Sequence, residues 1–177
     1  MKQKHVFIAI GIFWLVVIGG FIGYKEYTIR TGTEVLLKMA PVDPRDLFRG
    51  DYMILNYDIS RLDSIPSAPT GLKQHDKVFV ALTAGADAVV TATGAFTTPP
   101  QTGLYIAGEI DEWSRVTYGI ESYFIPENTG YDLGNKIRNS QGTAFVKVSI
   151  DKSGRSVVRA IVVGGQEINP KDLQPYK

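Results

Sequence analysis

The chain of 177 residues contains no cysteine and only two histidines, His5 and His75. Without thiols it can form no disulfide, no thiol nucleophile and no cysteine-ligated metal site. Two histidines so far apart do not suggest a histidine-based triad or a histidine-rich metal site. We therefore expect no metal and no cofactor, and no sequence motif marks a catalytic residue.

An excess of charge of one sign is also missing. Lys and Arg number 19 and Asp and Glu 18, which gives a net charge of +1. A nucleic-acid-binding protein would normally carry a basic stripe, so we expect no nucleic acid among the partners. The 18 glycines are scattered through turns and form no phosphate-binding loop. Hydrophobic residues, at 44% of the chain, can build one domain plus an anchor.

One long apolar run is present near the N-terminus. Val6 to Tyr24 is 19 residues without a charge, which at 1.5 Å per residue just crosses a hydrocarbon core of ~30 Å. The small residues near its end do not form the Ala-x-Ala-like pattern of a cleaved signal peptide. We therefore expect a retained membrane anchor over residues 1–26, rather than a buried core helix, and a domain over residues 27–177.

Basic residues flank the run on both sides, two lysines before it and Lys25, Arg30 and Lys38 after it. The local balance of positive charge therefore does not decide the orientation. Because a single N-terminal anchor usually leaves its domain outside, we expect a cytoplasmic N-terminus and an exported domain.

Gly19 and Gly23 lie four residues apart within the run. This spacing is typical of faces where two membrane helices pack closely. The alternative is that both glycines simply face lipid.

After the anchor, the sequence reads as short strands separated by turns. Two hairpins are expected, the second through Asp151–Arg155, where Gly154 supplies the left-handed turn position. The pattern predicts a mainly β domain, barrel-like or sandwich-like, with one short accessory helix. The strands are expected at 33–40, 52–60, 76–83, 88–96, 104–110, 115–125, 143–150 and 156–163, and the helix at 130–140.

The segment from residue 41 to residue 59 is the densest cluster of unusual residues. A turn bounded by prolines carries Arg45, Arg49 and Asp51, and a strand-like alternation follows. Every second residue, namely Met53, Leu55, Tyr57 and Ile59, would share one face. The segment is either a strand start held by local ion pairs or a recognition surface beside the membrane.

Three blocks of this chain resemble one family. Gly50-Asp51-Tyr52, Leu55 and Tyr57 match the signature Gly-Asp-Tyr-x-x-Leu-x-Tyr. Tyr118–Glu127 and the turn Asp151–Arg155 are similar to further blocks of the same family. The chain is identified as a member of the GDYXXLXY-signature family of small membrane-anchored bacterial proteins of unestablished function.

The resemblance implies a bacterial envelope location, with the anchor in the cytoplasmic membrane and the domain in the periplasm or outside the cell. Members are often encoded near multi-pass membrane proteins, which implies a membrane complex. The chain departs from the family at Gly134, where many relatives carry an acidic residue, so any role of that carboxylate is in doubt here.

A second resemblance provides the main alternative. Pro44, Gly50-Asp51 and Met53–Leu55 look similar to a motif of leader peptidases. Their Ser–Lys dyad needs a serine nucleophile, and the segment Met39–Asp43 contains none. A catalytically degenerate or divergent signal-peptidase-like domain stays open as an alternative, as does a hydrolase with a carboxylate or Ser/Lys site.

We expect a non-catalytic binding protein, an accessory subunit whose partner is a multi-pass membrane protein. Charged and aromatic side chains would give contact area and register. The alternative for Glu121 is an ion pair with Arg45, Arg49 or Arg115. The aromatic residues from Trp113 to Phe124 would line a ligand groove or, more typically, pack in the core. The expected partner-binding residues are Arg45, Arg49, Asp51, Tyr52, Tyr57, Glu121 and Glu127.

Overall fold

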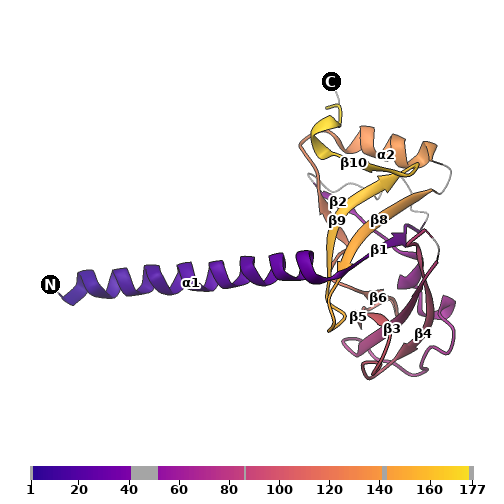
Figure 1. Cartoon of the computed structure of the whole chain (residues 1–177), viewed down its shortest axis with the longest axis horizontal. Helices are drawn as coiled ribbons and strands as arrows, with labels where there is room; N and C mark the ends of the chain where they lie inside the picture. The colour runs from indigo at the N-terminus through magenta and orange to yellow at the C-terminus, as the bar shows by residue number, and fades with distance from the viewer. Residues whose placement is uncertain (1, 41–51, 86, 141–142, 176–177) are drawn as a thin grey trace.

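The computed structural model describes residues 2–40, 52–85, 87–140 and 143–175. A long helix, α1 (Lys2–Thr31), leads into a β-rich domain and extends away from it (Figure 1). In the described part of the chain, the segment Lys4–Tyr27 is the one helix long and apolar enough to cross a membrane. Its large apolar side chains are 44–73% exposed, so the domain does not cover them.

Three antiparallel sheets make up the domain, and within the described ranges none of them closes into a barrel. The orders of their strands are β1-β8-β9-β10, β4-β3-β5-β6 and β2-β7. The prediction of a mainly β domain with a short helix is therefore confirmed. The strands are β1 (Thr33–Lys38), β2 (Tyr52–Ile54), β3 (Lys77–Ala84), β4 (Val90–Phe96), β5 (Leu104–Ile110), β6 (Val116–Thr117), β7 (Ser122–Phe124), β8 (Ala144–Ile150), β9 (Ser156–Val163) and β10 (Gln166–Ile168).

Both predicted hairpins are present, as β3 with β4 and β8 with β9. The accessory helix is α2 (Gly130–Asn139). Short 3₁₀ turns complete the domain as η1 (Asp58–Ser60), η2 (Leu62–Ser64) and η3 (Pro170–Asp172). One further strand, β10, follows β9 and pairs with it. The sequence analysis did not predict this strand.

Backbone contacts join the sheets. The N–H of Leu36 in β1 donates to the carbonyl of Ala88 at 2.9 Å, and the N–H of Ala107 in β5 donates to Gly154 at 2.8 Å. Buried apolar residues from all three sheets then form one core cluster. This core includes Leu37, Val80 and Ile106.

The strand predicted over 52–60 is much shorter in the structure. The ladder that begins at Tyr52 ends at Ile54, and residues 58–60 form η1. The residues expected to share one face are nevertheless all buried, namely Met53, Leu55, Tyr57 and Ile59.

The segment predicted as one strand over 115–125 divides into β6 and β7. Gly119, between them, has φ +74°. A left-handed residue at this point turns the chain out of the extended conformation. The break allows the two halves to join different sheets.

Candidate functional site

The two longest family-like blocks lie side by side in the fold. β2 pairs with β7, which places Tyr52 opposite Phe124. The pairing continues beyond β2, since the N–H of Leu55 donates to the carbonyl of Glu121 at 2.7 Å. Nothing in the sequence pattern had predicted this contact between distant segments.

Two buried tyrosines stabilise this junction through hydrogen bonds to the backbone. Tyr57 donates its hydroxyl to the carbonyl of Ile120 at 2.6 Å, and Tyr118 donates to Ile59 at 2.5 Å. The two rings meet edge to face, with centroids 6.4 Å apart. Burial, together with the nearby carboxylate of Glu121, raises the pKa of both hydroxyls far above the usual value. Both groups therefore remain neutral donors.

These contacts correct one part of the predicted binding surface. The side chain of Tyr57 is only 1% exposed, so it stabilises the fold and cannot contact a partner. Glu121 is half-buried, and its carboxylate accepts the N–H of Tyr118 at 2.5 Å. Arg115, an expected ion-pair partner of Glu121, instead donates to the side-chain oxygen of Asn56.

The other predicted surface residues have different positions. Tyr52 is half-buried and lies 6.3 Å from the ring of Phe124, which is 78% exposed. Glu127 is exposed. The remaining three, Arg45, Arg49 and Asp51, lie outside the described residues. In α1, a Cβ added at Gly19 or Gly23 would meet nothing within 4 Å, so their role in helix packing stays a prediction.

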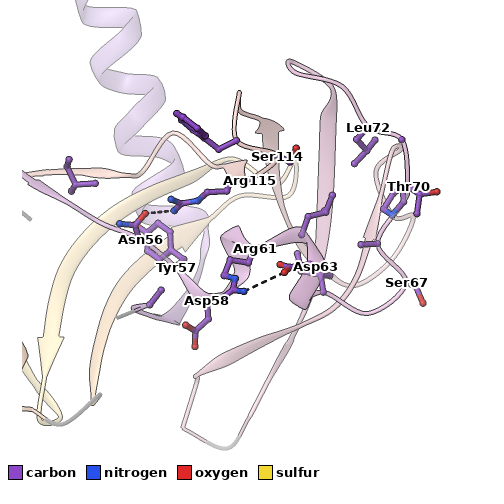
Figure 2. A pocket seen from close by; sticks show the side chains of 18 residues that line it. Asn56, Tyr57, Asp58, Arg61, Asp63, Ser67, Thr70, Leu72, Ser114 and Arg115 are labelled. Atoms are coloured by element: carbon purple, nitrogen blue, oxygen red, sulfur yellow. Dashed lines mark hydrogen bonds and ion pairs between the residues drawn. The ribbon is translucent and has the colours of Figure 1, made fainter. Parts of the chain in front are cut away.

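A broad depression lies beside this junction (Figure 2). Its volume is about 1670 Å³. The segment from residue 54 to η2, the loop 65–72 and the loop 113–115 contribute its walls. The side chains that line it include Asn56, Asp58, Arg61, Asp63, Trp113 and Arg115.

The two arginines of the depression come from adjacent backbone positions, because Arg61 and Arg115 form an antiparallel bridge. Arg61 pairs with Asp63, with a nitrogen–oxygen distance of 3.5 Å. The guanidinium of Arg115 is held by Asn56, as Figure 2 shows, and its Nε is buried without a hydrogen-bond partner in the described structure. Sequence reasoning did not bring these two arginines together, because their pairing spans 54 residues.

Trp113 stands at the edge of the depression and is 75% exposed. A tight loop holds it there, since Asp111 Oδ1 accepts the N–H groups of Trp113 at 2.8 Å and Arg115 at 2.7 Å. Of the four aromatic residues suggested as a groove lining, only Trp113 lies among the described lining residues. Tyr118 packs in the core instead.

The described lining of the depression includes two carboxylates, Asp58 and Asp63, and two serines, Ser67 and Ser114. The described lining of the depression contains no histidine, cysteine or lysine. No group of three or more metal-ligating side chains occurs among the described residues. In β8, Lys147 bonds Glu167 at 2.6 Å and lies 3.4 Å from Glu34. The hydrogen bond that Lys147 donates to Glu167 raises the pKa of Lys147, whereas a lysine base needs a lowered pKa.

Comparison with known proteins identifies one family. The family model described as GDYXXLXY protein matches residues 14–161. The match runs from within α1 to within β9 and includes both blocks that meet at the β2–β7 junction. No curated protein and no solved structure matches the chain.

Proposed function

The chain belongs to the GDYXXLXY protein family, and from that premise we propose that it is a membrane-anchored binding protein, an accessory subunit of a complex in the bacterial cytoplasmic membrane. The domain would face the periplasm or the cell exterior. Helix α1 supports the anchoring role, because its apolar side chains are exposed along a length that fits a bilayer.

The observation that carries the proposal is the open depression. Small-molecule sites are typically enclosed pockets of about 300–1,000 Å³, and this depression, at about 1670 Å³, is larger. Its lining includes Trp113, Arg61 and Arg115, and Trp and Arg are enriched among the residues that contribute most to binding at protein interfaces. A depression of this volume has room for a segment of a partner polypeptide.

A multi-pass membrane protein suits this depression as a partner. The depression belongs to a domain that follows α1 directly, so an exposed loop of a neighbouring membrane protein would lie within reach. Trp113 would supply contact area and Arg61 would supply directed hydrogen bonds. Tyr52, Phe124 and Glu127 would extend the surface along the β2–β7 ribbon.

The test is capture of the partner from native membranes in mild detergent, followed by mass spectrometry. The full-length chain is compared with a chain that keeps only the anchor. Trp113→Ala with Arg61→Ala should lower capture by at least about tenfold, because truncation of such anchors often costs 2 kcal/mol or more. Tyr131→Ala with Arg138→Ala, an exposed aromatic and cation on α2, should leave capture unchanged.

Two results would contradict the proposal. One is the absence of a stoichiometric multi-pass partner. The other is that capture falls equally in the Trp113/Arg61 double variant and in the Tyr131/Arg138 control. Arg49→Ala with Glu121→Ala should also weaken capture while the domain still unfolds cooperatively. Because Glu121 accepts a backbone hydrogen bond from Tyr118, the unfolding of the Glu121→Ala chain alone shows how much of the loss is structural.

A further inference from the structure

The link between the helix and the domain is short and regular. Helix α1 continues past the apolar run to Thr31, and β1 begins at Thr33 after the single residue Gly32. Residues 25–31 raise the helix about 10 Å above the end of the apolar run. A headgroup layer is roughly 5–8 Å thick on each side of the hydrocarbon core. A domain attached in this way begins within a few ångströms of the headgroups.

The turn between β8 and β9 lies at the same level. Thr33, the first residue of β1, pairs with Ile150, the last residue of β8. The turn 151–155 therefore follows directly beside the end of α1. Figure 1 shows it on the side of the domain from which α1 leaves.

This turn has a fixed shape. Asp151 Oδ1 accepts the N–H groups of Ser153 at 2.8 Å and Arg155 at 3.0 Å. Beneath the turn, Tyr105 donates its hydroxyl to the carbonyl of Lys152 at 3.1 Å. The carbonyl of Gly154 accepts the N–H of Ala107. These contacts hold the turn against β5, so the backbone from which its side chains extend has a fixed position.

The exposed charge of the turn is positive. Lys152 and Arg155 are exposed and Asp151 is half-buried, so the turn carries two positive charges and one negative charge. On α1, Arg30 pairs with Glu26, and Lys25 adds a further exposed cation just beyond the apolar run. The part of the molecule nearest the bilayer therefore has an excess of positive charge.

We propose that the turn 151–155 rests on the membrane surface and that Lys152 and Arg155 bind the phosphate groups of anionic phospholipids. The inference rests on the membrane anchorage in the proposed function. Each cation near an anionic surface strengthens binding roughly fivefold. Lipid contact at this turn would fix the direction in which the domain leans over the bilayer.

The test uses the full chain in lipid nanodiscs with a fluorophore on one introduced cysteine, which is unique because the native chain has none. Ser153→Cys reports on the turn, and Thr91→Cys reports on β4, which Figure 1 shows on the side away from α1. Gly20→Cys reports on insertion. Nitroxide quenchers are placed on the headgroups or, for Gly20→Cys, on the acyl chains. Nanodiscs of phosphatidylcholine alone are compared with nanodiscs that contain phosphatidylglycerol.

Headgroup quenching should be stronger at position 153 than at position 91. It should increase with phosphatidylglycerol and decrease with salt. Lys152→Gln with Arg155→Gln should remove the dependence on anionic lipid, while Lys73→Gln with Lys77→Gln, two exposed lysines elsewhere, should retain it.

Each contrary result has its own meaning. Equal quenching at positions 153 and 91 would overturn the placement of the turn. Quenching at position 153 that ignores anionic lipid would overturn the phosphate contact. A label at position 20 that escapes the acyl-chain quencher would overturn the anchor itself, and the proposed function with it.

Discussion

Tyr57 and Tyr118 each donate a hydroxyl hydrogen to the chain segment that carries the other. Tyr57 belongs to the family signature and was expected to contact a partner, because tyrosine is common at interfaces, whereas Tyr118 was expected to line a groove or to pack in the core. The alternation correctly grouped Tyr57 with Met53 and Leu55 on one face, which the structure shows to be buried. Its hydrogen-bond partner could not be predicted, because the acceptor lies 63 residues away.

Tyr57→Phe should lower the free energy of unfolding by about 1–3 kcal/mol, because the buried carbonyl of Ile120 loses its donor. Urea unfolding of the full chain in detergent micelles, followed by circular dichroism, measures this. The matched control is Tyr105→Phe. The Tyr105 hydroxyl donates to the exposed carbonyl of Lys152, and water can take the place of this hydroxyl in the variant. A Tyr57→Phe chain as stable as the control would show that the hydroxyl is dispensable.

Among the elements, the β8–β9 turn has a strict steric requirement at Gly154. Gly154 has φ +78°, and a Cβ there would lie 2.5 Å from a ring carbon of Tyr105 and 3.0 Å from the backbone nitrogen of Ala107. The backbone atom belongs to β5 and cannot move without disturbing the ladder. The turn and β5 are therefore fitted to each other.

Gly154→Ala should destabilise the domain more than Gly164→Ala does. Both glycines have positive φ, but a Cβ at Gly164 meets nothing within 4 Å. The control should cost about 1–2 kcal/mol from backbone strain alone, and Gly154→Ala should cost that amount plus the clash with Tyr105. The urea midpoints of the two variants give the difference directly. Equal midpoints would mean that β5 yields at no cost.

The elements show where sequence reasoning succeeds. Local alternation and turn residues were sufficient for the two hairpins and for the shared face of Met53, Leu55, Tyr57 and Ile59. They were insufficient at 115–125, because one left-handed residue, Gly119, splits an apparently continuous strand. The depression was not predictable at all, since Arg61 and Arg115 meet only through tertiary pairing.

For the whole molecule, the structure separates the helix from the core. Among the described residues, the first that belongs to the core cluster is Val35. We therefore expect a chain of residues 32–177 to fold in water without α1. Its thermal midpoint should lie within about 3 °C of that of the full chain in micelles, since less than about 1 kcal/mol is lost.

Calorimetry on both chains measures these midpoints, and a single cooperative transition is expected for the short chain. Aggregation of the short chain, or a broad transition at much lower temperature, would show instead that α1 belongs to the fold. The division at residue 27 drawn from the apolar run would then be untenable.

The single residue between α1 and β1 also has a mechanical consequence. A flexible tether would absorb any movement of the domain, whereas one glycine between a helix and a paired strand leaves little slack. A lateral force applied at the depression would then be transmitted through the domain and would act as a torque on α1 within the bilayer. In mechanical terms the chain is a lever, with its load arm in the domain and its fulcrum where α1 leaves the bilayer.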